Sequence, residues 1–431
     1  MIWNREAETL PRQQLQRLQL ARLQTTLGRL LECVPPMRQR LHAAGITSPS
    51  ELASLDDIQK LPFTTKSDLR QEYPFGLFAV PREAIIRVHA SSGTKGKPTL
   101  VGYTRNDLQV WAEVVARTLA LGGVRPGMVL HIAAGYGLFT GGMGFHMGGE
   151  RLGCTVVPAG AGFSQRQITL MMDLGAQALK STPSYALNLA ATLHEMGLTA
   201  TDLKLEVGLF GAEPWTEAMR PAIERGLGLR AINDYGLSEI IGPGVSAECI
   251  EVRNGMHIQE DHFLPEVVDP STGRPLPPGH QGELVLTTLT KEALPLLRYR
   301  TGDVSSLDLE PCDCGRTHAR MSAVSGRLDD MLIIRGVNLY PTEVERVLLA
   351  LTDVSPNYQL VVDRPAALDE LTVVCEPASA NVKTEGLRAR VSQAVQAAIG
   401  LSVRVEVAAV GSIPRSEGKA VRVIDRRGRS V

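Results

Sequence analysis

The sequence has little of several features that would direct it to a particular partner or compartment. Aromatic residues make up 4% of its 431 residues, there are six cysteines, and the formal net charge is −1. Balanced charge gives no electrostatic basis for binding nucleic acid or an anionic membrane surface. No apolar run approaches the roughly 20 residues of a membrane span, and the polar N-terminus is unlike a signal peptide. Because sparse cysteines fit a reducing compartment, we expect a soluble cytoplasmic protein that binds neither nucleic acid nor membrane.

The length and the periodicity predict two domains. From about residue 80 to 240, short apolar segments such as MVLHIAA and LEVGLFGA alternate with helical stretches. This alternation favours a mostly parallel sheet, whose ligands gather at the carboxyl ends of the strands. Residues 244–310 read as antiparallel strands, and the chain ends in an α+β pattern of helix, strand, strand, helix and strand. We expect domains at 1–330 and 331–431, with a short hinge near 329–331.

The segment HASSGTKGKPTLVGYT, residues 89–104, is rich in glycine, hydroxyl groups and lysine. It does not match a Walker loop, because only two residues separate Gly93 from Gly96 and because Pro98 disfavours a helix start at Lys97. Backbone amides and hydroxyls of such a loop suit polyphosphate oxygens. Taken alone, the segment is equally typical of a polar hairpin between two strands.

Eight segments spread over almost the whole chain carry a resemblance to a known family. They are HASSGTKGKPT, GYGLFTGG, GAEPWTE, NDYGLSE, QEDHFLPEVVDP, LTKEALPLLRYRTGD, GRLDDMLIIRGVNLYPTEVE and IPRSEGKAVRV. In this order they resemble the phenylacetate–CoA ligase family of the adenylate-forming superfamily. The resemblance implies an α/β fold: a large N-terminal adenylate-forming domain with mixed, mostly parallel sheets, and a small mobile C-terminal α+β domain. It also implies an AMP-forming reaction in which an aryl acid becomes an acyl-adenylate and is then transferred to coenzyme A.

The resemblance assigns a set of residues to ATP. The phosphate-loop positions are Ser91, Ser92, Gly93, Thr94, Gly96 and Lys97, and the adenine-flanking positions are Gly211, Ala212, Glu213, Asn233, Asp234, Tyr235 and Gly236. Two departures stand out. Lys95 replaces the more usual threonine, and the usual aspartate before Tyr235 falls on Asn233, with Asp234 one residue later. Which of Asn233 and Asp234 faces the nucleotide stays open at this stage.

The chemistry of the remaining motifs fits the roles that the resemblance implies. Glu239 matches the Mg²⁺ ligand, since a hard divalent ion needs carboxylate oxygen. Asp303 would accept hydrogen bonds from the ribose hydroxyls, with Arg327 beside it. Lys419 matches the mobile lysine that meets charge developing at the α-phosphate. Asp329 matches the hinge about which the small domain would rotate.

For the acid pocket, the resemblance points to Tyr136 and Phe139, with Ala212 and Gly236 as further walls. An aromatic pair at spacing three is more often part of a core. Only the match to the family motif favours the pocket here. Lys180 stands in a strand that is commonly apolar in the family. If Lys180 faces the interior it must be paired, because an unpaired buried charge is costly, and a substituted or more polar aryl acid would then fit.

The cysteines give a separate indication of metal binding. Cys312 and Cys314 lie one residue apart, and Cys249 stands eight residues before His257. Four thiolate and imidazole ligands close a structural tetrahedral zinc site. His318 or His262 is an alternative fourth ligand, and two unlinked reduced thiols are the plainer interpretation.

Three functions compete on the sequence alone. The leading one is an aryl-acid–CoA ligase that uses ATP, Mg²⁺ and coenzyme A, with structural zinc. The second is a stand-alone adenylation enzyme that loads a carrier protein. The third is a nucleotide-binding regulator without catalysis, which the presence of Glu239, Asp303 and Lys419 disfavours. The family resemblance also implies a homodimer.

Overall fold

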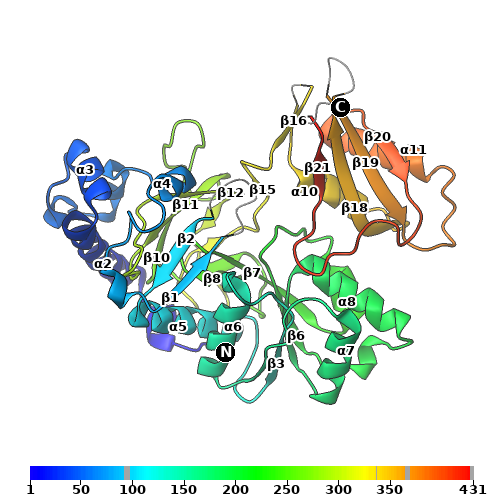
Figure 1. The fold of residues 1–431 in the computed structure, drawn as a ribbon, viewed down its shortest axis with the longest axis horizontal. Coiled ribbons are helices and arrows are strands. Elements are labelled where there is room, and N and C mark those ends of the chain that lie inside the picture. The colour runs from blue at the N-terminus through cyan, green and yellow to red at the C-terminus, as the bar shows by residue number, and fades with distance from the viewer. Residues whose placement is uncertain (92–97, 336, 365–368, 428–431) are drawn as a thin grey trace.

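The computed structural model describes residues 1–91, 98–335, 337–364 and 369–427, and the chain forms a large α/β part and a smaller C-terminal part beside it (Figure 1). None of the helices within these ranges combines the length and the apolar character that crossing a bilayer demands. The expected fold class is confirmed: the large part holds mixed sheets, and the C-terminal part is an α+β unit.

The chain begins with helices that pack on the large part. They are α1 (Arg5–Glu8), α2 (Arg12–Cys33), α3 (Pro35–Ala43) and α4 (Lys66–Gln71). On α2, Leu23, Leu27 and Leu30 recur at helical spacing and are buried. Pro35 stands at the first position of α3, where its missing N–H costs nothing. The start of the chain therefore forms two consecutive helices, α2 and α3, that bury apolar side chains against the large part.

The main sheet has nine strands in the order β13-β14-β9-β8-β7-β6-β5-β3-β4. Its parallel half consists of β3 (Val129–Ile132), β4 (Thr155–Val157), β5 (Ala178–Ser181), β6 (Val207–Phe210) and β7 (Arg230–Leu237). Its antiparallel half consists of β8 (Gly242–Glu248), β9 (Met256–Ile258), β13 (Leu307–Asp308) and β14 (Arg320–Met321). The change of direction comes between β7 and β8, after the segment NDYGLSE.

Helices connect and cover the parallel strands. They are α5 (Arg105–Leu121), α6 (Thr140–Leu152), α7 (Ser164–Asp173), α8 (Pro183–Glu195) and α9 (Arg220–Leu227). Helix α5 starts at a capping box in which Thr104 and Asp107 satisfy each other's backbone N–H groups. Glycines on α6 allow close packing, since a Cβ at Gly144 would come 2.5 Å from Pro243. Such crossover helices are expected between parallel strands.

Two smaller sheets complete the large part. The hairpin β1 (Arg87–Ala90) and β2 (Leu100–Tyr103) flanks residues 92–97, which lie outside the described residues. A four-stranded antiparallel sheet contains β10 (Phe263–Val268), β11 (Gly282–Thr288), β12 (Tyr299–Ser305) and β15 (Gly326–Arg327). The latter sheet confirms the antiparallel reading of residues 244–310.

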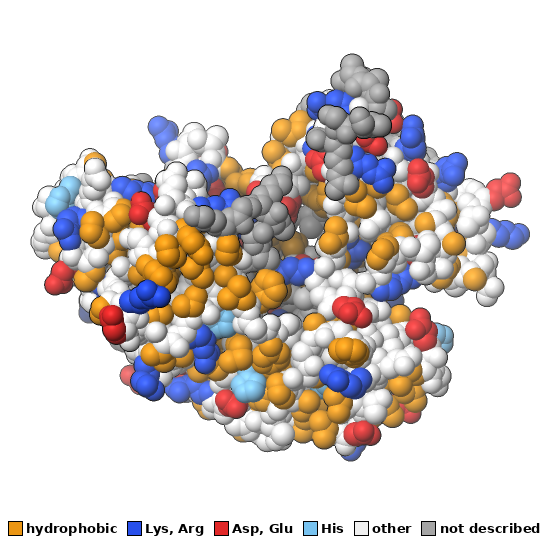
Figure 2. Space-filling model, viewed as in Figure 1, with side chains coloured by type: hydrophobic (Ala, Val, Ile, Leu, Met, Phe, Trp, Pro, Cys, Tyr) orange, Lys and Arg blue, Asp and Glu red, His pale blue; other side chains and the backbone are white. Residues whose placement is uncertain are grey.

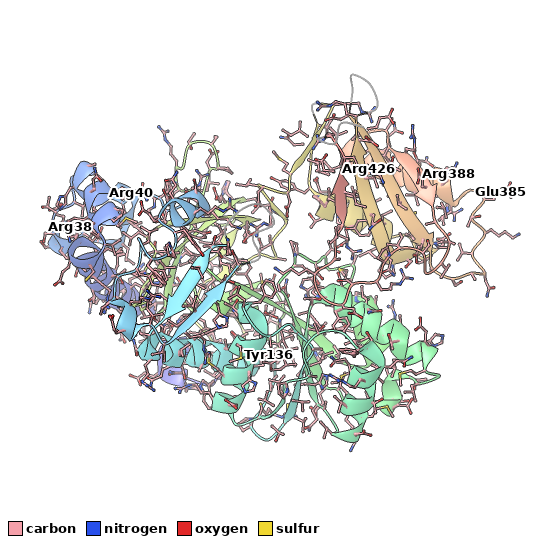
Figure 3. All side chains as sticks on the ribbon, viewed as in Figure 1. Arg38, Arg40, Tyr136, Glu385, Arg388 and Arg426 are labelled. Atoms are coloured by element: carbon pink, nitrogen blue, oxygen red, sulfur yellow. The ribbon has the colours of Figure 1, made fainter. Side chains whose placement is uncertain are left out.

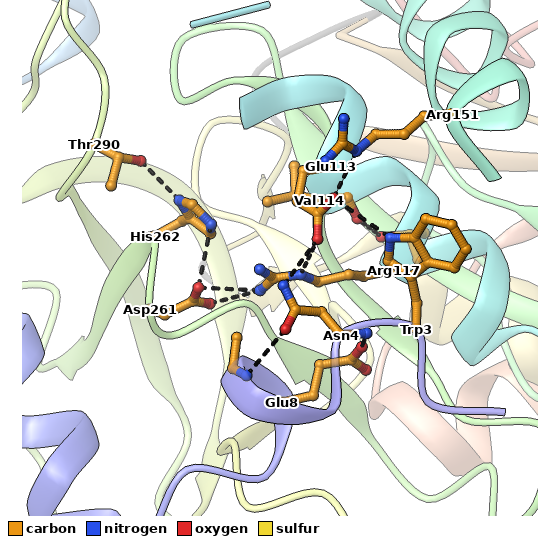
Figure 4. Close-up of polar contacts among 12 residues, drawn as sticks. Trp3, Asn4, Glu8, Glu113, Val114, Arg117, Arg151, Asp261, His262 and Thr290 are labelled. Atoms are coloured by element: carbon orange, nitrogen blue, oxygen red, sulfur yellow. Dashed lines mark hydrogen bonds and ion pairs between the residues drawn. The ribbon is translucent and has the colours of Figure 1, made fainter. Parts of the chain in front are cut away.

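A buried polar network attaches the start of the chain to α5 (Figure 4). Asn4 donates a hydrogen bond of 3.1 Å to Glu113, and Arg117 donates one of 2.9 Å to Asp261. The side chains of Arg117 and Asp261 are each only 3% exposed. Burial opposes ionisation of Asp261, but His262 and Arg117 hold its pKa below the usual range. Charges buried at this depth are tolerated because each has an opposite partner.

The C-terminal part has its own apolar core. Its elements are the hairpin β16 (Leu332–Ile334) and β17 (Val337–Leu339), helices α10 (Pro341–Leu349) and α11 (Leu387–Ile399), and strands β18 (Val354–Asp363), β19 (Glu370–Pro377), β20 (Arg404–Val407) and β21 (Val423–Asp425). The sheet order is β20-β19-β18-β21, with an antiparallel central pair and parallel edges. The two parts meet across a hollow in the molecular surface (Figure 2).

Candidate active site

Three polar side chains from three strands meet beside the hollow. The hydroxyl of Tyr235 on β7 donates a hydrogen bond of 2.6 Å to Asp303 Oδ2 on β12. Arg327 on β15 places Nη1 3.1 Å from Asp303 Oδ1. Asp303 is 4% exposed, and burial raises its pKa, although Arg327 and Tyr235 oppose this effect. A carboxylate has about four lone-pair sites, so Asp303 keeps accepting capacity for a further ligand.

Glu239 follows β7 and lies close enough to Asp303 to oppose its ionisation. Its side chain is 5% exposed, and among the described residues it forms no ion pair with a lysine or arginine within 4.0 Å. A buried carboxylate without a cationic partner is costly. The donor and its surroundings therefore suit a divalent cation.

Asn233 and Asp234 point to opposite sides of β7, as alternation along a strand requires. Asp234 accepts a hydrogen bond from Lys180 of β5, and both side chains are buried. Asn233 lies on the same side of the strand as Tyr235, and its backbone N–H donates to Glu248. Lys180 is thus buried and paired, as its position required.

Residues 211–213 follow β6 and contact the C-terminal part through hydrogen bonds. Ala212 adopts a φ of 71°, in the left-handed region that a residue with a Cβ rarely occupies. The carboxylate of Glu213 accepts hydrogen bonds from the backbone of Ser184 at 2.8 Å and of Ala420 at 2.9 Å. The strained turn therefore carries a contact to the segment next to Lys419.

Lys419 lies where the two parts meet, and Thr182 of the large part donates to the neighbouring Gly418 carbonyl at 2.8 Å. The Lys419 side chain is exposed, yet the protein around it removes enough water to lower its pKa, which Glu213 opposes. Among the described residues it forms no ion pair within 4.0 Å. Its ammonium is therefore free to meet a ligand charge.

The phosphate loop is described only at its edge. Ser92, Gly93, Thr94, Gly96 and Lys97 lie outside the described residues. Ser91, just after β1, donates its backbone N–H to the Thr99 carbonyl at 3.0 Å. The side-chain hydroxyls of Ser91 and Thr99 are buried and have no hydrogen-bond partner in the described part of the chain. The base of the loop thus holds unused hydrogen-bonding groups.

Two of the four residues predicted for the acid pocket, Tyr136 and Phe139, lie just before α6. Tyr136 lies beside α6 in the large part, well away from Arg388 and Glu385 of the C-terminal part (Figure 3). Its hydroxyl is 3.3 Å from His146 Nδ1 on α6. Phe139 is 51% exposed. Gly236 closely approaches β8, since a Cβ there would meet the Gly242 carbonyl at 2.2 Å.

Asp329 lies at the junction between the two parts. Arg327 Nε donates to Asp329 Oδ1 at 2.9 Å, so one guanidinium contacts both Asp303 and Asp329. The Asp329 side chain is 61% exposed. Through Arg327, the junction is thus linked directly to the cluster around Asp303.

Cys249, His257, Cys312 and Cys314 come together in one cluster, formed where β8, β9 and the turn between β13 and β14 meet. One ligand atom from each residue lies within 4.8 Å of all the others. Cys249 Sγ is 3.8 Å from Cys312 Sγ, and Cys314 Sγ is 3.5 Å from His257 Nε2. Tetrahedral zinc with bonds of about 2.3 Å to sulfur and about 2.0 Å to nitrogen places these pairs about 3.8 and 3.5 Å apart. The donor set and its spacing therefore fit zinc.

The alternative histidines lie elsewhere. His262 Nδ1 is 2.8 Å from the Thr290 hydroxyl, and its Nε2 is 3.2 Å from Asp261. His318 is buried, which lowers its pKa. Within the cluster, contacts with Cys249 and His257 lower the pKa of Cys314, although burial opposes this effect.

Sequence reasoning missed one unusual buried group, Lys291. It is 4% exposed, and its Nζ has no hydrogen-bond partner among the described residues. The Nζ lies 3.6 Å from the centroid of the Tyr103 ring. Burial lowers its pKa to about 8, although Asp107 opposes the shift. The sequence signal that could have indicated it is the position of this lysine next to the apolar run ALPLL in the motif LTKEALPLLRYRTGD.

The chain matches two family models. Residues 41–289 match the model described as AMP-binding enzyme, and residues 336–427 match the AMP-binding enzyme C-terminal domain. A phenylacetate–coenzyme A ligase from Thermus thermophilus is 54% identical, with 99% of this chain and 100% of that protein covered. A phenylacetate–coenzyme A ligase from Aromatoleum evansii is 49% identical, with 97% and 96% covered.

Two solved structures of 2-hydroxyisobutyryl-CoA ligase extend the comparison. The structure in the postadenylation state, in complex with R3-HIB-AMP, gives a TM-score of 0.93 at 32% identity, with 99% of this chain and 92% of that chain covered. The structure in the thioesterification state, in complex with 2-HIB-AMP and CoA, gives 0.74 at 33% identity, with 99% and 93% covered. Because the sequence identity barely differs, the difference in score lies in the arrangement of the chain.

Proposed function

The chain belongs to the phenylacetate–CoA ligase family of AMP-binding enzymes, and from this premise we propose that it joins an aryl acid, phenylacetate or a related compound, to coenzyme A. The enzyme is an AMP-forming acid–thiol ligase that uses ATP. The observation that carries this function is 54% identity to a phenylacetate–coenzyme A ligase over the full length of both chains.

The first half-reaction is assigned to the residues beside the hollow. The acid carboxylate attacks the α-phosphate of ATP, and pyrophosphate leaves. Asp303 holds the ribose, with Tyr235 and Arg327 fixing the carboxylate by their hydrogen bond and ion pair. Lys419 places its ammonium against the charge that develops at the α-phosphate. Glu239 would hold Mg²⁺, which neutralises charge on the triphosphate.

The second half-reaction requires a different arrangement of the two parts. The thiol of coenzyme A attacks the acyl carbon, and AMP leaves. The present arrangement is like that of the postadenylation-state ligase rather than the thioesterification-state one. We assign the rotation to Asp329, which links to Asp303 through Arg327. The domain limits 1–330 and 331–431 follow from this assignment as part of the proposal.

A structural zinc ion belongs to the proposal as well. Cys249, His257, Cys312 and Cys314 would hold it, and four protein ligands leave no open position for catalysis. The ion would link Cys249, just after β8, and His257 on β9 to the turn between β13 and β14. Its contribution would be to stability rather than to chemistry.

A homodimer in the cytoplasm completes the proposal. The family resemblance supports the dimer, and the sparse cysteines support the compartment. Light scattering should give a mass near twice 46.6 kDa. A mass equal to that of one chain would contradict the dimer without affecting the ligase.

A panel of acids tests the function. Purified protein with ATP and Mg²⁺ is offered each acid, and pyrophosphate release is measured first without and then with coenzyme A. Phenylacetate or a substituted aryl acid should give pyrophosphate, and coenzyme A should give the thioester. A carrier protein is offered as the competing acceptor. No acid-dependent pyrophosphate from any acid would overturn the ligase, and transfer to the carrier protein alone would replace coenzyme A as acceptor.

A further inference from the structure

A buried ion pair crosses the central strands of the main sheet. Lys180 on β5 donates a hydrogen bond to Asp234 on β7, and each side chain is 4% exposed. The chain leaves space for the pair at Gly211, just after the intervening strand β6. A Cβ at Gly211 would come 2.8 Å from Asp234 Oδ2. The absence of a side chain at Gly211 is therefore part of how the pair is accommodated.

The pair lies next to the residues assigned to the acid pocket. Gly236 follows Asp234 by two residues on β7, so the two share one side of the strand. The register shift at this point inserts its extra residues in β8, so alternation along β7 is kept. Phe145 of α6 covers the pair, with its ring centroid 4.3 Å from Lys180 Nζ. The pair therefore lies on the side of β7 that α6 covers, and α6 begins directly after Phe139, one of the aromatic residues assigned to the pocket.

The pair has hydrogen-bonding capacity to spare. An ammonium has three N–H donors, and Lys180 uses one of them, on Asp234, within the described residues. The second carboxylate oxygen of Asp234 has no hydrogen-bond donor there. Burial lowers the pKa of Lys180 and raises that of Asp234, so the site disfavours both charges. A buried ion pair is also a poor source of stability compared with apolar residues of similar volume.

We propose that Lys180 and Asp234 form a specificity element that recognises a hydroxyl group on the ring of the acid substrate. This inference rests on the proposed function and names its substrate class: a hydroxylated aryl acid in preference to phenylacetate itself. A hydroxyl both donates and accepts, so it can donate to the free oxygen of Asp234 and accept from a free N–H of Lys180. A charged substituent would unbalance the pair and is disfavoured.

The native enzyme tests this first. The ratio kcat/KM for adenylate formation is measured with 3- and 4-hydroxyphenylacetate, with the corresponding methylphenylacetates as apolar controls of similar size, and with phenylacetate. One hydroxylated acid should exceed its methyl counterpart and phenylacetate by about 10- to 100-fold, less than the discrimination of sites whose polar groups have no other partner. A native preference for the methylated acid or for phenylacetate would overturn the proposal.

The double variant Lys180→Met, Asp234→Leu tests the residues. It removes both charges together, so no uncompensated charge stays buried, and its thermal midpoint shows whether it folds. The folded variant should prefer the methylated acid. An unchanged ratio of hydroxylated to methylated acid would overturn the assignment, and if the variant does not fold, the native ratio decides alone. Failure of the ligase function itself is distinguishable, because then no acid at all releases pyrophosphate.

Discussion

The cluster around Asp303 and the cluster around Cys312 are satisfied in different ways. Around Asp303, the partners Tyr235 and Arg327 come from two other strands of the large part, and Arg327 also pairs with carboxylates at the junction. Lys419 has no ion pair within 4.0 Å among the described residues. Around Cys312, the donors face one another at the separations of a single tetrahedral ion. The first arrangement leaves capacity for ligands that enter and leave. The second suits one ligand that stays.

The largest expected effect comes from removing the free charge of the first cluster. Lys419→Ala should slow adenylate formation by about 10²- to 10³-fold, the cost of losing one group that stabilises transition-state charge. Thioester formation from supplied acyl-adenylate should be largely spared. Pyrophosphate release and thioester formation, measured separately, check the division. Lys383→Ala, which changes an exposed lysine of the same part, is the control; equal losses in both steps would contradict the assignment.

Disrupting the cluster around Cys312 should lower the stability of the fold rather than slow the reaction directly. Purified protein should contain about one zinc per chain, and Cys312→Ser should release it. In a chain of this length, a loss of about 2 kcal/mol would lower the midpoint of thermal unfolding by roughly 2–3 °C, with activity falling only as the fold loosens. Cys33→Ser, at an exposed cysteine, should change neither zinc content nor midpoint. Zinc near zero in protein never exposed to a chelator would refute the site.

A substitution at Asp329 tests whether the two parts must rotate between the half-reactions. Asp329→Pro fixes one backbone dihedral and should slow the thioester step by about 10-fold more than the adenylate step, within the range attributed to gating motions. Asp329→Ala is the matched control, since it also loses the contact to Arg327 but keeps the backbone free. Equal thioester rates in the two variants would mean that rotation at Asp329 is not required.

The last prediction extends the comparison to a buried lysine that has no hydrogen-bond partner among the described residues. Lys291 has a folded-state pKa of about 8 against an ordinary 10.5. Below pH 8 both states are protonated and burial destabilises the fold. From pH 8 to 10.5 the unfolded state holds more protons, so stability rises with pH. Lys291→Met should add about 1–3 kcal/mol at pH 7 and remove this rise. Urea unfolding at pH 7 and 10 measures it, with exposed Lys204→Met as control; a rise that persists in Lys291→Met would contradict it.

Periodicity predicted the elements that stand in regular alternation. The apolar runs around residues 129–132, 178–181 and 207–210 became β3, β5 and β6, and the amphipathic segment at 106–123 became α5. Helix α6 was not predicted, because five glycines between 141 and 149 obscure its pattern. Several of those glycines allow close packing, Gly144 against Trp111 and Pro243 and Gly148 against Val115, which a single sequence does not reveal.

The site was predictable where a motif fixes the chemistry and not where partners come from distant strands. Spacing named Cys249, His257, Cys312 and Cys314 as possible ligands, but three histidines competed until β9 placed His257 opposite Cys314. Similarly, the spacing of Lys180 and Asp234 in the sequence does not predict that they form an ion pair. Their contact depends on the order β5-β6-β7 and on the missing side chain at Gly211.

The path of one oxygen atom tests the two-step reaction most directly. The accepted aryl acid is labelled with ¹⁸O at both oxygens of its carboxylate and converted in the presence of ATP, Mg²⁺ and coenzyme A. Because the carboxylate oxygen attacks the α-phosphate and stays on phosphorus when the thiol displaces AMP, mass spectrometry should find one ¹⁸O in each AMP formed. Unlabelled AMP, or label in pyrophosphate or inorganic phosphate, would contradict an acyl-adenylate and with it the proposed function.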